Sequence, residues 1–175
     1  LFSFVICAYH FFYFKLNTQT TILLTAALSF MYPFGLRKIP FAKIFFISFV
    51  WAIVSMFFLV IENEIIITQN IVLHLVSRFL FVFAITIPFD IRDLKYDIGK
   101  LMTIPLFFGE KKAKWLANFA LLICVVIAIF QQIQNNIILS NFLALILLYF
   151  LTLAFVTKSE KKNNEMYFSF WVESL

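Results

Sequence analysis

The feature that most constrains this chain is a series of long apolar runs that carry almost no charge. A helix that spans a bilayer needs about 20 apolar residues, with a usable range of about 17–25. Four segments fit that length within a residue or two: 44–61, 71–89, 115–133 and 137–157. Hydrophobic residues make up 63% of the sequence and charged residues 13%, which is far more apolar than a soluble domain. The sequence therefore predicts an all-α, polytopic transmembrane helical bundle in contact with the lipid bilayer.

Three further apolar segments are shorter. Residues 20–34 form one of them, and residues 1–14 and 166–175 form the other two, at the ends of the chain. We therefore expect a single transmembrane domain over residues 1–175, with about seven spans of which the first and last are clipped. Because both ends fall inside apolar runs, we expect the function to belong to a longer parent protein. We expect the 175-residue piece to be inactive alone.

The basic residues alternate from loop to loop. Segments 35–43, 90–114 and 158–165 hold twelve Lys and Arg residues, whereas segments 15–19, 62–70 and 134–136 hold only Lys15. Short loops rich in Lys and Arg remain on the cytoplasmic side, so we expect the first set, which includes the aspartate loop, to face the cytoplasm. We expect the protein to lie in a bacterial inner membrane. The net charge of +5 then reflects orientation and implies no nucleic-acid partner.

The longest of these basic loops also carries a cluster of acids. Asp90, Asp93 and Asp97 are spaced i, i+3, i+7, which on a continuous α-helix places them within roughly 60° of one another. Lys100 lies near the same face, about 80° from Asp90, whereas Arg92 is expected to point to the other side. Carboxylate oxygens suit Mg²⁺, which commonly shares its coordination with substrate phosphates. Spacing alone leaves two interpretations open: a seat for a magnesium diphosphate, or a solvated connector whose acids balance its lysines.

The residues around these acids resemble a known family motif. The pattern Asp-Ile-Arg-Asp-x-x-x-Asp-x-Gly-Lys-x-x-Thr-Ile-Pro-x-x-x-Gly over residues 90–109 is similar to the second aspartate motif of the UbiA-type intramembrane prenyltransferases. The resemblance implies Mg²⁺-dependent transfer of a polyprenyl group from a polyprenyl diphosphate to a small aromatic, quinone-precursor acceptor. It implies Asp93 and Asp97 as catalytic, metal-bridging acids with Asp90 as a third metal ligand. Lys100, also catalytic, and Arg92 would contact the diphosphate.

The resemblance covers only part of the family pattern. Family members have nine spans, and a first motif, Asn-Asp-x-x-Asp-x-x-x-Asp, lies between the second and third. That motif is absent from this chain, whose spans match the third to the ninth. Two alternatives to the enzyme therefore remain: a non-catalytic UbiA-like membrane protein, and an unrelated polytopic transporter.

Two polar residues interrupt the segment that leads to the acids. Arg78 lies near the middle of the segment 71–89, with His74 one turn before it, and a charge at such a depth usually faces a cavity or a partner. An i+4 stripe connects them to the acids: His74, Arg78, Val82, Thr86 and Asp90. Both residues are candidates for substrate binding in a cavity below the diphosphate. The alternative is a structural arginine paired with Glu62, Glu64 or backbone carbonyls.

Overall fold

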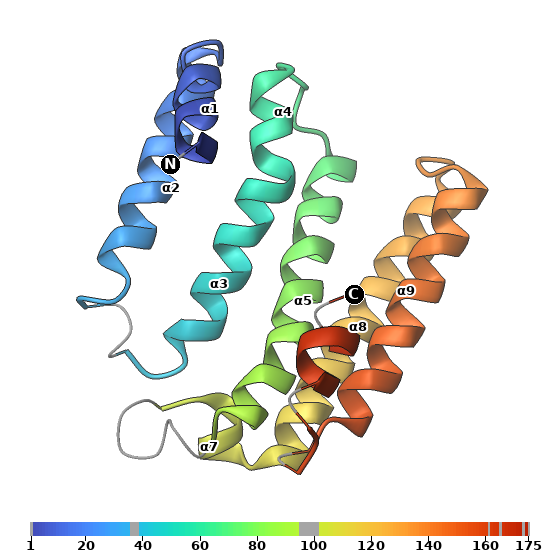
Figure 1. Ribbon diagram of the computed structural model, residues 1–175. Coiled ribbons are helices and arrows are strands. Elements are labelled where there is room, and N and C mark those ends of the chain that lie inside the picture. The colour runs from blue at the N-terminus through green and yellow to red at the C-terminus, as the bar shows by residue number, and fades with distance from the viewer. Residues whose placement is uncertain are drawn as a thin grey trace.

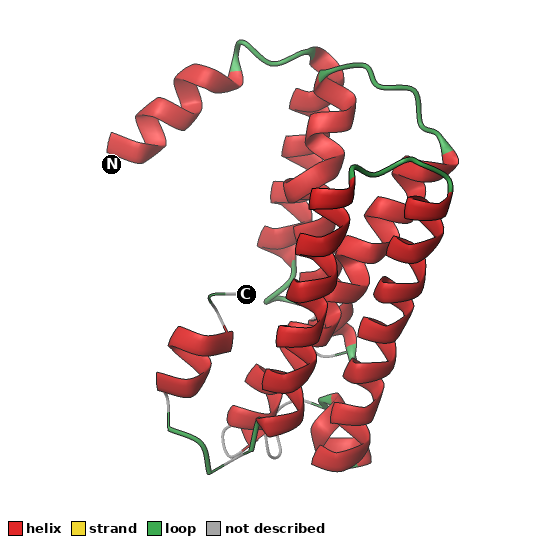
Figure 2. Cartoon of the chain, turned by 90° about the vertical axis from the view of Figure 1, so that its right-hand side faces the viewer, coloured by secondary structure: helices red, strands yellow, loops and turns green. Residues whose placement is uncertain are grey.

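The computed structural model describes residues 2–35, 39–94, 102–160, 162–164, 166–172 and 174. Every regular element within these ranges is a helix, as Figure 2 shows, so the predicted all-α class is confirmed. In chain order the elements are α1 (Phe2–Phe11), α2 (Leu16–Met31), α3 (Ala42–Ala52), η2 (Ile53–Phe57), α4 (Phe58–Glu62), α5 (Gln69–Arg92), α7 (Ile104–Phe108), α8 (Glu110–Ile133), α9 (Leu139–Lys158) and η3 (Tyr167–Val172).

Four helical rods in the described ranges are long and apolar enough to cross a membrane. The first is Ala42–Glu62, in which η2 is a π-helical turn between α3 and α4, and the others are α5, α8 and α9. They lie where the four full-length spans were expected. The other three expected spans contain shorter helices, and even the 16 residues of α2 extend only about 24 Å, less than the ~30 Å of a hydrocarbon core.

Helix α5 is the centre of the bundle. Helix α3 packs on one side of it and α8 on the other, with α9 against α8 (Figure 1). Five small residues of α8 are buried in the common core, and one of them, Cys124, contacts α5 directly: Ala113, Ala117, Ala120, Cys124 and Ala128. Small side chains let two helix backbones approach closely, which is the main source of packing contact between helices in lipid.

Polar contacts join the same helices nearer the start of α5. The hydroxyls of Ser77 and Tyr149 lie 2.9 Å apart and connect α5 to α9. The Cys124 thiol of α8 donates to the Ser77 carbonyl at 3.4 Å, and the Gln131 amide donates to the Asn70 carbonyl at 3.2 Å. These bonds satisfy polar groups inside the membrane-spanning part of the bundle.

The bundle has two chemically different ends. We call the end at which α5 finishes and α3 and α8 begin the aspartate end, and the end with the α4–α5 and α8–α9 turns the opposite end (Figure 1). At the opposite end, Lys15 pairs with Glu64 at 2.8 Å, and its backbone N–H donates to Glu62. The hydrogen bond from Lys15 and its positive charge lower the pKa of the Glu64 carboxyl. Both acids therefore pair with Lys15 and not with Arg78.

Candidate functional site

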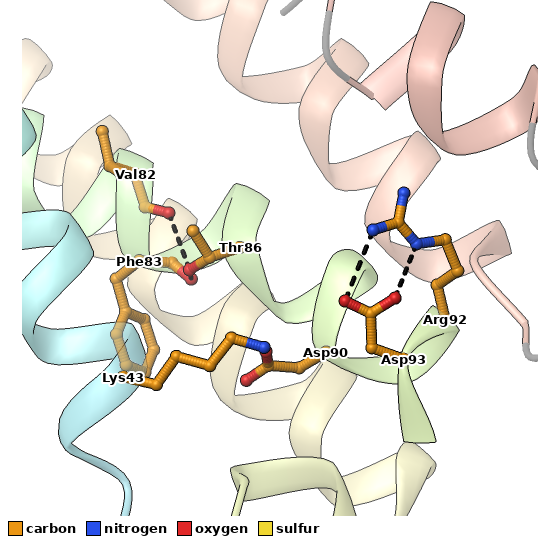
Figure 3. Close-up of polar contacts among 7 residues, drawn as sticks. All are labelled: Lys43, Val82, Phe83, Thr86, Asp90, Arg92 and Asp93. Atoms are coloured by element: carbon orange, nitrogen blue, oxygen red, sulfur yellow. Dashed lines mark hydrogen bonds and ion pairs between the residues drawn. The ribbon is translucent and has the colours of Figure 1, made fainter. Parts of the chain in front are cut away.

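Asp90 is a buried carboxylate that joins two transmembrane helices. It lies in the last turn of α5, and its side chain is 4% exposed. One of its carboxylate oxygens forms an ion pair with the Lys43 Nζ at 2.7 Å. Lys43 comes from the first turn of α3, so the pair crosses the α3–α5 interface (Figure 3). A buried charge of this kind requires a close partner of opposite sign. The aspartate end thus holds an ammonium group and a carboxylate inside the bundle.

Asp93 forms the second acid–base pair, with its own chain neighbour. The Arg92 guanidinium donates from Nε to one Asp93 oxygen at 2.8 Å and from a terminal nitrogen to the other at 3.3 Å (Figure 3). The guanidinium carbon also lies 5.3 Å from the centre of the Phe89 ring and 5.9 Å from that of Phe168 in η3. The expectation that Arg92 points away from the acids is therefore wrong.

The end of α5 explains this difference. The helical-wheel argument assumed one continuous helix through Asp97, but α5 ends at Arg92, and Asp93 is the C-cap residue with φ −83° and ψ 0°. Beyond a helix end the i, i+4 geometry no longer fixes which side chains share a face. Arg92 and Asp93, adjacent in sequence, can then meet. Asp97 and Lys100, the other predicted site residues of this loop, lie outside the described residues.

The segment after the loop closes against the start of α3. The Phe41 N–H donates to the Met102 carbonyl at 2.9 Å, and the Phe41 ring stacks on Phe108 of α7. Next to this contact, Thr103 is buried, and its hydroxyl has no hydrogen-bond partner in the described part of the chain. Met102 and Thr103, in the described second part of the motif, therefore lie beside the first turn of α3, which carries Lys43.

The predicted polar stripe of α5 divides into two parts. Thr86 uses its hydroxyl on the carbonyls of Val82 and Phe83 of its own helix (Figure 3). His74 and Arg78 line a separate cavity nearer the opposite end, with Ser77 and Tyr149. Twelve residues of helix separate Arg78 from Asp90, which is about 18 Å along the axis. The structure therefore brings Asp90, Asp93 and Arg92 to one end of α5 and places His74 and Arg78 elsewhere.

Lys43 is a site residue that sequence reasoning missed. It was counted only among the basic loop residues that set orientation. The sequence contained a sign of this role, because Lys43 is the last charge before an apolar span. That span begins at the membrane surface at which α5 ends. Basic residues at that position can reach a carboxylate on an adjacent helix.

The described donors are compatible with a hard cation. Asp93 is partly exposed, and its carboxylate oxygens are of the type that Mg²⁺ binds. Asp90 is less accessible because Lys43 already covers it. No cluster of three or more potential metal-binding side chains occurs within the described ranges, which exclude Asp97. Among the described acids of the aspartate end, Asp93 is therefore the carboxylate that a cation could reach, and one carboxylate alone does not make a magnesium site.

The fold and this end of the bundle define an all-helical integral membrane protein with paired acids and bases at the point where a central helix leaves the membrane. The chain matches the UbiA prenyltransferase family over residues 1–174. It therefore belongs to that family, and the alternative of an unrelated transporter falls away. No curated protein and no solved structure gives a significant match.

Proposed function

We propose that the protein transfers a polyprenyl group from a polyprenyl diphosphate to a small aromatic, quinone-precursor acceptor within the membrane, in a reaction that depends on Mg²⁺. Family membership over residues 1–174 carries this proposal. The paired acids and bases at the aspartate end support it, because a diphosphate and its metal need both cationic and carboxylate partners. The aspartate end is then the diphosphate site.

Each residue of the site has a distinct part in binding. Asp93, with Asp97 from the undescribed loop, would hold the magnesium ion, which neutralises the negative charge that develops on the leaving diphosphate. Arg92 orients the Asp93 carboxylate by its two hydrogen bonds, and its positive charge would attract the diphosphate. Asp90 holds Lys43 in place, and Lys100 would add a further diphosphate contact.

The tail of the donor has a place in the same interface. Between the Ala42–Glu62 rod and α5 lies an apolar hollow of about 360 Å³, lined by residues such as Phe49, Ile53, Val76 and Phe79. Phe49 is six residues along the rod from Lys43, or about 9 Å. A prenyl chain whose diphosphate meets Lys43 could therefore run along the α3–α5 interface into this hollow.

The reaction itself breaks one bond and forms another. The allylic C–O bond of the donor breaks, and diphosphate leaves with the bonding electrons. An aromatic carbon of the acceptor forms the new C–C bond and then loses a proton. The apolar helices around the site exclude water, which would otherwise capture the allylic cation.

A transfer assay with the full-length protein in detergent tests this proposal. The assay would follow incorporation of a labelled polyprenyl group into candidate aromatic acids, with Mg²⁺ and with EDTA. We expect product only with Mg²⁺, a loss of at least about tenfold in Asp93→Asn, as for a lost charge-assisted contact, and no change in the exposed acid control Glu160→Gln. Full binding of donor without turnover would favour the non-catalytic alternative.

Donor length provides a second arm of the assay. Val76→Trp adds a large side chain to the hollow without touching the aspartate end. We expect this variant to raise KM for long polyprenyl diphosphates and to leave a single-isoprene allylic donor unaffected. An equal effect on both donors would place the tail elsewhere.

A further inference from the structure

A second polar cavity lies inside the bundle, away from the aspartate end. Its volume is about 310 Å³, near the lower end of the range for ligand pockets, and it lies among α5, α8, α9 and η2. Its polar lining residues are His74, Ser77, Arg78, Gln131 and Tyr149, and the rest of the wall is apolar. All five polar residues lie in candidate membrane spans, where polar side chains are costly and usually functional.

The chemistry of this lining suits an anion. Arg78 contributes a guanidinium group with five N–H donors, which makes no hydrogen bond or ion pair with any residue in the described ranges. His74 likewise has no hydrogen-bond partner there. Of the hydroxyl pair Ser77–Tyr149, only one hydrogen is used between them, so the other can be donated to a ligand. The described lining contains no carboxylate that would neutralise Arg78.

The cavity continues towards the opposite end of the bundle. A second hollow of about 560 Å³ shares His74, Leu145 and Leu148 with it and reaches Asn136 and Asn141 at the α8–α9 turn. Arg78 lies nine residues into α5, about 14 Å along the axis, and long basic side chains extend towards the membrane surface. The two hollows adjoin at these three shared residues, and we call them together the path: it extends from the α8–α9 turn to Arg78, with Leu145 and Leu148 between.

We propose that this path binds an acidic membrane amphiphile, with its phosphate or carboxylate headgroup on Arg78 and His74 and its chain along Leu145 and Leu148. A freely soluble anion would meet the same cation, but the largely apolar walls favour a ligand with an apolar body. The inference is independent of the proposed prenyl transfer, because the site is separated from Asp90 by about 18 Å of helix.

Thermal unfolding of the full-length protein tests the site. Cys124 is fully buried, so a fluorogenic thiol reagent in a Cys7→Ser background reports unfolding. The protein in neutral detergent would be titrated with short-chain phosphatidic acid, with phosphatidylcholine of the same chains, and with inorganic phosphate. We expect only phosphatidic acid to raise Tm, and Arg78→Gln to weaken its apparent affinity about ten- to a hundredfold.

Two further variants separate charge from shape. Lys112→Gln removes an exposed positive charge at the aspartate end and should leave the Tm increase intact. Leu148→Trp narrows the shared part of the path without changing charge and should abolish it. A Tm increase that persists in both Arg78→Gln and Leu148→Trp, or none in the wild-type protein, would overturn the proposal. An equal response to inorganic phosphate would overturn its assignment to an amphiphile.

Discussion

At the residue scale, the two acid–base pairs of the aspartate end differ in how far they are withdrawn from water. The Asp90–Lys43 pair is nearly enclosed, with side chains 4% and 24% exposed, whereas Arg92 and Asp93 are 35% and 28% exposed. A buried ion pair contributes little net stability, but removal of one partner leaves an uncompensated charge. A partly solvated pair contributes less than about 1 kcal/mol. Loss of one partner should therefore affect folding most at the Asp90–Lys43 pair, whereas at the Arg92–Asp93 pair it should affect mainly ligand binding.

Lys43→Met should destabilise the protein. It leaves the Asp90 carboxylate buried without its ammonium partner, and we expect the free energy of unfolding to fall by about 3 kcal/mol. Lys111→Met, at an exposed lysine of α8, should change it by less than about 0.5 kcal/mol. Chemical denaturation in mixed micelles measures both, and the double variant Lys43→Met/Asp90→Leu should recover most of the loss. Equal stabilities of the two single variants would contradict the assignment.

Arg92→Gln should weaken diphosphate binding as much as Asp93→Asn does. Arg92 orients the Asp93 carboxylate through two hydrogen bonds. Each single change should therefore weaken the same charge-assisted contact with the metal–diphosphate and reduce the binding free energy by about 1.5–3 kcal/mol. The double variant should therefore cost clearly less than the sum of the two. Calorimetric titration with a polyprenyl diphosphate analogue and Mg²⁺ provides the three affinities. Additive losses would mean that the two residues act separately.

At the element scale, the connection from α7 to α8 depends on one glycine. Gly109 ends α7 and precedes α8 with φ 84° and ψ 158°, a region of backbone conformation essentially restricted to glycine. No atom lies within 4 Å of the place that a Cβ would occupy, so the constraint is conformational and not steric. The glycine of the predicted motif thus sets the direction in which α8 enters the membrane.

Gly109→Ala should consequently destabilise the protein by about 1–3 kcal/mol. Gly35→Ala is the matched control, because its Cβ would also meet open space and its φ is not in the unfavourable range. That change should stay within about 0.5 kcal/mol. Denaturant unfolding of the two variants compares them directly. A Gly109→Ala protein as stable as Gly35→Ala would show that the turn adapts to a side chain.

The elements were easier to predict than the site. A helix that spans the bilayer needs about 20 consecutive apolar residues, so α5, α8 and α9 can be found from the apolar runs of the sequence alone. The Arg92–Asp93 pair depends on where α5 ends, and sequence does not fix a helix end to the residue. The Asp90–Lys43 pair depends on packing between segments 47 positions apart, which periodicity does not report. The site could therefore be located from its motif, but its ion pairs could not.

At the scale of the whole molecule, the charge asymmetry predicts which end faces the cytoplasm. Of the residues in the twelve-to-one distribution of Lys and Arg, the described ones at the start of α3, the end of α5 and the start of α8 lie at the aspartate end, so this end should be cytoplasmic. Single cysteines at Ile67 and Lys111, both exposed and at opposite ends, test this in intact cells. An impermeant maleimide should label Ile67→Cys and not Lys111→Cys. The reverse pattern would invert the orientation.

The central claim is that the aspartate end binds a diphosphate through Mg²⁺. The measurement that tests it most directly is the binding of a non-hydrolysable polyprenyl diphosphate analogue to the full-length protein, with and without Mg²⁺, for the wild type and for Asp93→Asn. We predict that Mg²⁺ strengthens binding to the wild type and that Asp93→Asn loses this gain, at a cost of about 1.5–3 kcal/mol. Binding that is unaffected by Mg²⁺ and equal in the two proteins would contradict the account and leave the loop as a solvated connector.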